Sequence, residues 1–222
     1  MTVTTGSFVV LVASVAVVTL SPLMALDTVQ VVGTSRLDAG SVSTALDEYR
    51  GTPLALLDEG AIRNDLAAFP LIRSFSTEVI PPHTLVVRIV ERAPIGAIER
   101  GAVVDLVDAA GVVVESSAER PAGIPLLAPG STDPDSVAFR SVAEVLTALP
   151  ADLRAQVDVI SASTRDDVTF TMSGLGHRVV WGSAERSDFK ARVLAAAIAA
   201  TGQGAPSEYD VSAPESLVVR QL

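Results

Sequence analysis

The chain has 222 residues, a net charge of −10 at pH 7 and no cysteine. The acidic charge argues against a nucleic-acid-binding face, which needs basic residues to neutralise phosphates. The lack of cysteine excludes disulfides, thiolate metal sites and cysteine nucleophiles. The sequence contains two histidines, His83 and His177, so a metal site of three histidines is excluded and the composition disfavours an enzyme.

A long apolar run lies near the N-terminus. Residues 8–26 carry no charged side chain, and the first charged residue is Asp27. A helix over this run spans about 28 Å, close to the roughly 30 Å hydrocarbon core of a bilayer. We therefore predict a transmembrane helix over 8–26, with residues 1–7 as a short cytoplasmic tail and the bulk of the chain outside the cytoplasm. A cleaved signal peptide is the alternative, but the run is long for one and no basic residue precedes it.

Residues 27–98 follow the order strand, helix, helix, strand, strand. Pro81-Pro82-His83 provides the turn between the last two strands. The predicted elements are a strand at 28–32, helices at 37–49 and 58–69, and strands at 72–80 and 84–90. The pattern indicates a small module of βααββ order.

Residues 99–222 predict a second module. A strand pair within 103–114 is followed by an irregular stretch rich in proline and glycine, and Pro150 ends an amphipathic helix. The predicted elements are helices at 136–149 and 187–200, and strands at 157–161, 168–172, 178–181, 208–212 and 217–221. We expect a mixed β-sheet with helices packed on one side, so the predicted fold class of the whole chain is α+β.

The sequence offers no converging set of catalytic groups. Glu91 and Arg92 are interpreted as a surface ion pair at the end of a strand. His83 and His177 are interpreted as exposed turn residues, and the adjacent carboxylates at 166–167 as a solvated turn. We predict no catalytic residue, no cofactor, no metal site and no small-molecule substrate.

The C-terminus suggests binding through a strand edge. Leu217 to Val219 form an apolar, β-rich run with no later element to cover it, flanked by Glu215 and Arg220. The free edge of a sheet carries backbone donors and acceptors that an extended partner can pair with. The alternative is an internal strand that closes the sheet. On the edge hypothesis, proline in place of Val218 is expected to remove one backbone donor.

Several short motifs resemble those of a known family. They are Val31-Val32-Gly33, Gly51-Thr52-Pro53-Leu54, Pro82-His83-Thr84-Leu85, Glu91-Arg92-Ala93-Pro94, Ile124-Pro125-Leu126-Leu127 and Tyr209-Asp210-Val211-Ser212-Ala213-Pro214. In this order and spacing they resemble FtsQ, also called DivIB, a family of bacterial cell-division proteins, in its actinobacterial form. The resemblance implies a POTRA domain at 27–98 and an FtsQ-type β domain at 99–222, ending in an exposed edge strand.

The resemblance also implies partners. In the family, the terminal strand region binds FtsB, within the FtsB–FtsL complex, by strand addition. Carried over to this sequence, the contact residues are Ala213, Pro214, Leu217, Val218, Val219, Arg220 and Gln221. Trp181, the single tryptophan, is a candidate partner hot spot, with packing inside the second module as the alternative.

The implied function is that of a scaffold. A single-pass plasma-membrane protein would gather FtsB, FtsL and septal peptidoglycan synthases at the division septum, without catalysis. Two alternatives stay open. One is a POTRA-containing secretion or transport component that binds polypeptides, and the other is a membrane-anchored hydrolase.

Overall fold

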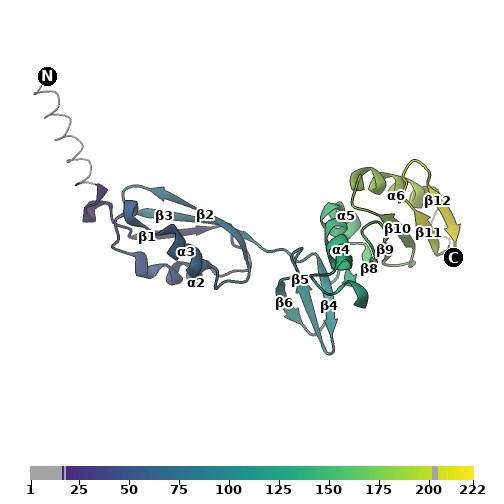
Figure 1. Cartoon of the computed structure of the whole chain (residues 1–222), viewed down its shortest axis with the longest axis horizontal. Helices are drawn as coiled ribbons and strands as arrows, with labels where there is room; N and C mark the ends of the chain where they lie inside the picture. Colours follow the sequence, from purple (N-terminus) through teal and green to yellow (C-terminus); the bar gives the residue numbers. More distant parts are fainter. Residues whose placement is uncertain (1–16, 18, 202–204) are drawn as a thin grey trace, which may run out of the picture. The chain divides into compact units, whose positions relative to one another are not determined.

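The computed structural model describes residues 17, 19–201 and 205–222. The chain divides into two compact units, Met1–Arg92 and Ala93–Leu222, called here the first unit and the second unit (Figure 1). The boundary lies earlier than the predicted one between Ile98 and Glu99. The reason is that Ile98 belongs to β4 (Gly96–Arg100), which pairs with β5 (Val103–Val107) in the sheet of the second unit.

The end of the predicted membrane helix belongs to the first unit. Pro22–Met24 form a short 3₁₀ helix, η1, which is capped by Ser21. Leu26 is 2% exposed and packs in the core of the first unit, and its N–H donates to the Thr52 carbonyl at 2.9 Å. The predicted span therefore extends too far toward the C-terminus. Leu26 packs against the protein core and does not face lipid.

The rest of the predicted N-terminal topology is mostly not covered. The predicted tail at 1–7, and positions 8–16 and 18 of the predicted span, lie outside the described residues. Among the residues that the structure does describe, no helix has the length and apolar character needed to cross a membrane.

The first unit packs two helices on a small sheet. Its described strands, in the order β1-β3-β2, place β3 between a parallel and an antiparallel neighbour. The bounds are β1 (Thr28–Val32), α2 (Ala39–Ala45), η2 (Asp47–Tyr49), η3 (Leu54–Leu56), α3 (Glu59–Leu66), β2 (Ile72–Ile80) and β3 (Thr84–Glu91). Asp38 and Asp58 cap α2 and α3 by accepting hydrogen bonds from backbone N–H groups. The predicted βααββ order is confirmed.

The core of the first unit lies between its helices and one face of the small sheet. Its buried members include Val42, Leu46, Ile62, Leu66, Leu85, Val87 and Ile89. Gly33 follows β1 with φ +88°, and a Cβ at this position would lie 2.2 Å from the Ile89 carbonyl oxygen. The close approach of this loop to β3 therefore requires glycine.

The second unit contains one large mixed sheet. Its described strands follow the order β12-β11-β10-β9-β8-β7-β4-β5-β6, and the pairs β10–β11, β4–β7 and β7–β8 are parallel. The further strands are β6 (Val113–Ser117), β7 (Leu126–Leu127), β8 (Val157–Ser161), β9 (Val168–Met172), β10 (Arg178–Gly182), β11 (Ser207–Asp210) and β12 (Val218–Gln221). The helices are η4 (Pro129–Ser131), α4 (Val137–Ala148), α5 (Ala151–Arg154) and α6 (Ser187–Thr201). The α+β class with a large mixed sheet is confirmed.

Helices α4 and α6 cover the core of the second unit. The Ser136 side chain caps α4 by accepting a hydrogen bond from the Phe139 N–H at 2.9 Å, at the start predicted from the sequence. The buried core comprises residues of both helices and of the central strands, among them Phe139, Val142, Leu146, Ile160, Phe170, Trp181, Leu194 and Tyr209.

Strand β7 is a narrow joint in the large sheet. It consists of Leu126 and Leu127. In the described structure its register with β4 is the single pair Ala97–Leu126. Pro129 begins η4 just after β7. Because proline has no N–H to donate, the ladder between β4 and β7 cannot continue through this position.

Candidate functional site

Strand β12 lies at one end of the large sheet (Figure 1). In the described part of the chain it is hydrogen-bonded to β11 along one side, with the antiparallel register Ser207–Gln221, Glu208–Arg220, Tyr209–Val219 and Asp210–Val218. The other side of β12 has no neighbouring strand among the described residues. This edge is where the second unit offers backbone groups to a partner strand.

The register decides which backbone groups face outward. The Leu222 N–H donates to the Pro206 carbonyl at 3.1 Å. Because backbone groups alternate along a strand, Val218 and Arg220 also direct their N–H groups toward β11. Val219 and Gln221 then direct theirs away from the sheet. Proline at Val218 would therefore remove a donor that pairs with β11, and the donors that face a partner strand are those of Val219 and Gln221.

The side chains of β12 differ between the two faces of the sheet. Arg220 lies on one face, where its Nη1 is 3.2 Å from the Glu208 carboxylate, and the Arg178 Nε lies 3.7 Å from the same carboxylate. Val219 lies opposite Tyr209 and therefore shares its face. Leu217, Val218, Val219 and Leu222 are all exposed, so an added strand would meet apolar side chains as well as backbone groups.

Strand β11 holds β12 in place from the core side. Tyr209 is fully buried, and its hydroxyl lies 2.6 Å from the Thr201 Oγ1 at the end of α6. The His177 Nδ1 accepts a hydrogen bond from the Ser207 N–H at 3.2 Å, and its ring meets Tyr209 edge-on at 5.3 Å between centroids. His177 is buried, so its interpretation as an exposed turn residue is wrong.

The loop before β12 contains the first two predicted contact residues. Ala213 is exposed, whereas Pro214 is buried. Arg186 forms an ion pair with Glu215, and this hydrogen bond is the main cause that lowers the pKa of the Glu215 carboxyl. The predicted set thus lies together along one edge, except that Pro214 faces the protein.

Trp181 cannot serve as a partner hot spot in this fold. Its side chain is 0% exposed, its Nε1 donates to the Ser187 Oγ at 3.2 Å, and its ring lies 5.6 Å from that of Phe170. The hot-spot interpretation is therefore wrong, and the alternative of packing inside the second module is correct. A buried tryptophan needs a partner for its N–H, and the Ser187 hydroxyl supplies it.

Lys190 is a structural residue that the sequence reasoning missed. This side chain, the only lysine of the sequence, is 2% exposed. Its Nζ donates to the carbonyls of Trp181 at 3.0 Å and Ser183 at 2.9 Å. Burial is the main cause that lowers its pKa. The sequence did contain an indication of this burial. Lys190 has helical spacing with Leu194 and Ala197, which places it on the buried face of α6.

The comparisons with known proteins agree with this architecture. Residues 24–92 match the family model "POTRA domain, FtsQ-type". The cell division protein FtsQ of Mycobacteroides abscessus is 34% identical over 203 residues, which cover 90% of this chain and 63% of the relative. The FtsQ of Streptomyces bingchenggensis is 31% identical over 208 residues, which cover 90% of this chain and 77% of the relative. The chain belongs to the FtsQ family.

Family membership confirms the resemblance read from the sequence and supports a role in cell division. The FtsQ of Mycolicibacterium smegmatis is 32% identical over 200 residues. This chain spans 58% of that relative and 63% of the Mycobacteroides abscessus relative. The POTRA match starts at residue 24, consistent with the packing of Leu26 in the first unit.

Glu91 of the Glu-Arg-x-Pro motif serves the fold of the FtsQ-type POTRA unit. Its carboxylate accepts hydrogen bonds from the N–H groups of Ser35 at 2.7 Å, Arg36 at 3.0 Å and Leu37 at 2.8 Å. The hydrogen bond from Leu37 is the leading cause that lowers the pKa of Glu91 to about 2, against the opposing effect of burial. The ion pair that Glu91 forms is with Arg36, whose Nε lies 3.8 Å from the carboxylate, and the three backbone hydrogen bonds are shorter than this contact.

The other candidate residues also bind neighbouring backbone. The His83 Nδ1 lies 2.9 Å from the Ala25 carbonyl oxygen. Asp167 accepts hydrogen bonds from the N–H groups of Ser163 at 2.9 Å and Thr164 at 2.7 Å, which makes residues 163–167 a local turn. Within the described ranges, no group of three or more His, Asp or Glu side chains could hold a metal ion.

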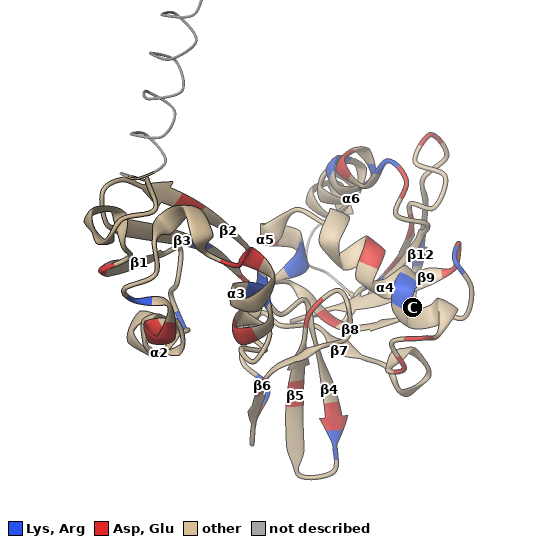
Figure 2. Ribbon diagram, turned by 60° about the vertical axis from the view of Figure 1, so that its left-hand side comes forward, with Lys and Arg blue, Asp and Glu red and all other residues tan. Residues whose placement is uncertain are grey.

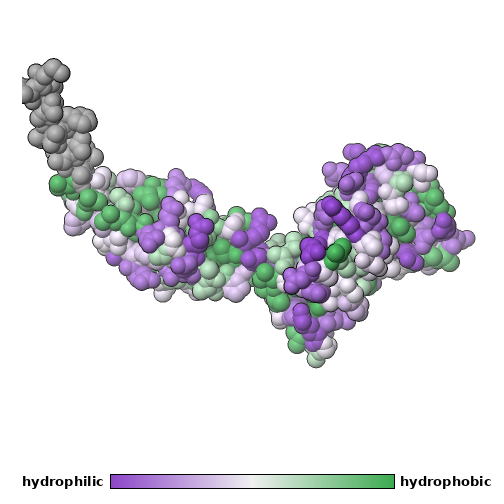
Figure 3. Space-filling view, in the orientation of Figure 1, coloured by the Kyte–Doolittle hydropathy of each residue, from purple (hydrophilic) through white to green (hydrophobic). Residues whose placement is uncertain are grey.

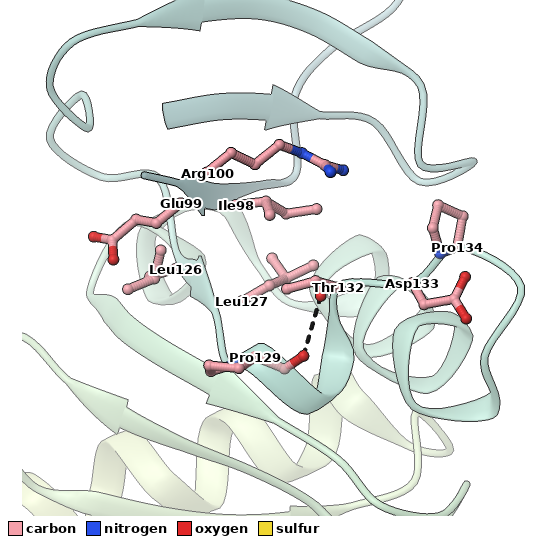
Figure 4. A pocket seen from close by; sticks show the side chains of 9 residues that line it. All are labelled: Ile98, Glu99, Arg100, Leu126, Leu127, Pro129, Thr132, Asp133 and Pro134. Atoms are coloured by element: carbon pink, nitrogen blue, oxygen red, sulfur yellow. Dashed lines mark hydrogen bonds between the residues drawn. The ribbon is translucent and has the colours of Figure 1, made fainter. Parts of the chain in front are cut away.

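A pocket of about 520 Å³ opens where β4 extends beyond β7. Figure 4 shows Ile98 and Leu127 facing its interior, while the Glu99 carboxylate points away. The end of β4 carries an acidic and a basic residue (Figure 2), and the Arg100 Nε lies 3.0 Å from the Asp105 carboxylate. Thr132 donates to the Pro129 carbonyl at 3.1 Å (Figure 4). Because two of its polar side chains are bound to protein groups, the pocket is a weaker candidate site than the β12 edge.

Proposed function

We propose that this FtsQ-family protein is a membrane-anchored division scaffold that binds an extended segment of FtsB, within the FtsB–FtsL complex, along β12. The observation that carries the proposal is the free edge of β12. The N–H groups of Val219 and Gln221 are directed away from β11, and an added strand would satisfy them with its own carbonyl groups.

The apolar side chains of β12 support the same assignment. A partner strand beside β12 would cover the exposed Val219 on the Tyr209 face, and Val218 on the other. Backbone pairing then supplies affinity, and the side chains on both faces supply specificity. Binding of this kind needs no catalytic group, and the proposal assigns the protein none.

Membrane anchoring completes the proposed mechanism. We infer that the uncharged segment before η1, residues 1–21, contains a single span of the plasma membrane, with the N-terminus on the cytoplasmic side and the protein enriched at the septum. Confinement to the membrane raises the effective concentration of weakly binding partners, including septal peptidoglycan synthases. The secretion and hydrolase alternatives find no specific support in the described residues.

The decisive experiment measures capture of purified FtsB by the full chain carrying Val219→Pro. Proline removes the outward N–H of Val219 while leaving the N–H groups of Val218 and Arg220 free to bind β11. We expect capture to fall at least about tenfold, since a net hydrogen bond and the fit of the added strand are both lost. Val219→Thr is the matched control, because it keeps the N–H and a branched side chain.

Folding of the variant is checked separately. Gln221→Pro removes the other outward donor and should weaken capture in the same way, and Val219→Pro should leave the near-UV signal of the buried Trp181 unchanged. Capture of FtsB by Val219→Pro as strong as by Val219→Thr would contradict the proposed binding edge.

A further inference from the structure

Exposed apolar side chains gather at one end of the first unit. Figure 3 shows apolar residues gathered on this part of the unit. The exposed fractions lie between 44% and 71% for Leu20, Leu23, Leu56, Val79 and Ile80. Single exposed apolar residues are ordinary, whereas several at one end of a small unit suggest a contact surface.

Backbone contacts place these side chains at the same end. Ala25 forms a β-bridge with Pro53, which directly precedes η3 and Leu56. The N–H of Asp27 donates to the carbonyl of His83 at 2.9 Å. The tip of the β2–β3 hairpin therefore lies beside the residues that follow η1, as Figure 1 also shows.

The connection between this end and the preceding apolar run is short and structured. Ser21 to Ala25 separate Leu20 from Leu26, which is buried in the core. Five extended residues reach at most about 18 Å, and η1 shortens this because a 3₁₀ helix rises only about 2 Å per residue. The headgroup layer is itself roughly 5–8 Å thick on each side of the hydrocarbon core.

We propose that this end of the first unit rests on the lipid surface, with Leu23, Leu56 and Ile80 at the boundary between headgroups and acyl chains. The inference depends on the proposed membrane span and is independent of FtsB binding. Because η1 and Leu26 belong to the folded unit, the end that carries them lies within about 18 Å of the boundary of the proposed span.

The charges near this end favour an apolar contact over attraction to anionic lipid. Arg88 is paired with Glu78 at 2.8 Å, and Arg50 with Asp47 at 2.6 Å. Asp27 is exposed and adds an acidic group. Without an excess of basic charge, the surface should contact a zwitterionic bilayer and need no anionic headgroup.

The absence of cysteine from the sequence allows a direct test. Single substitutions Ile80→Cys and Ser74→Cys carry a spin label in the full chain, reconstituted in phosphatidylcholine vesicles. Both positions lie on β2 and share a face, about 20 Å apart. We expect the Ile80 label to collide at least about threefold more with oxygen, relative to a water-soluble nickel complex, than the Ser74 label.

A third label at Val12→Cys separates the possible failures. If Val12 lies in lipid but the Ile80 label is as accessible to nickel as the Ser74 label, the membrane contact is overturned while the span stands. If the Val12 label is also accessible to nickel, both the span and the contact are overturned. A thermal unfolding midpoint equal to that of the unlabelled chain shows that each label leaves the fold intact.

Discussion

The same four residues occur at the last strand of each unit, in different surroundings. Leu-Val-Val-Arg occupies 85–88 within β3 and 217–220, where Leu217 directly precedes β12 and the other three residues begin it. In β3 the three apolar residues are 0–3% exposed, whereas in β12 they are 38–40% exposed. Both arginines pair with a glutamate on the neighbouring strand, Arg88 with Glu78 and Arg220 with Glu208.

The difference arises from the position of each strand in its sheet. Strand β3 is paired on both sides, by β1 and β2, and its Leu85 and Val87 pack in the core of the first unit. Strand β12 is paired with β11 and has no further neighbour among the described residues. The same tetrapeptide thus stabilises a core in one unit and forms a free edge in the other, so its function is decided by topology.

The largest expected difference between the two strands is in amide hydrogen exchange. The Val87 N–H should exchange through unfolding of the first unit, more than about 1,000-fold slower than the outward N–H of Val219. Within β12, Val218 and Arg220 should exchange more slowly than Val219 and Gln221. Equal rates along β12, measured by NMR, would disprove the register on which the binding proposal depends.

Matched truncations should sharpen the comparison. Val87→Ala removes two buried methyl groups and should destabilise the first unit by about 2–3 kcal/mol. Val219→Ala at the exposed edge should cost less than about 0.7 kcal/mol in the second unit. Urea unfolding followed by NMR signals of each unit measures both values. A similar cost at the two positions would show that β12 is covered in solution.

A smaller effect should come from the polar end of β3. Glu91→Gln weakens the acceptor for three backbone N–H groups and should destabilise the first unit by about 2 kcal/mol at pH 7. The pKa of Glu91 is lowered to about 2, so its stabilisation is present above about pH 4.5 and is lost as the pH falls toward 2. The stability difference between parent and variant should shrink over that range, and a constant difference would exclude the charge as the cause.

Local features of the fold could be predicted from the sequence, and long-range ones could not. The βααββ order, and a helix over 136–149 where α4 lies, followed from periodicity and from the position of Pro150. The role of Glu91 did not, because its carboxylate binds N–H groups 54–56 positions earlier in the chain. Leu26 was assigned to the membrane span because an apolar side chain is equally stable in lipid and in a protein core.

The candidate site shows the same limit. The apolar run at 217–219 predicted a strand, but the repeated tetrapeptide demonstrates that these residues suit a central strand as well as an edge. Which N–H groups face outward depends on the register with β11, fixed by contacts such as that between Ser207 and His177. The presence of a single tryptophan at position 181 suggested an aromatic contact residue. It did not show whether that residue contacts a partner or the core.

The narrow joint at β7 affects how deformation passes through the second unit. Twist normally accumulates by about 20–25° from strand to strand. Because β7 meets β4 at Ala97 in the described structure, few backbone bonds join β4, β5 and β6 to the rest of the sheet, but Ile98 and Val107 share one core with Leu146 and Ile160 across the joint. The two portions of the sheet are therefore held together by side-chain packing more than by backbone pairing, so a cavity-forming substitution in this shared core should loosen the joint more than the loss of one ladder bond.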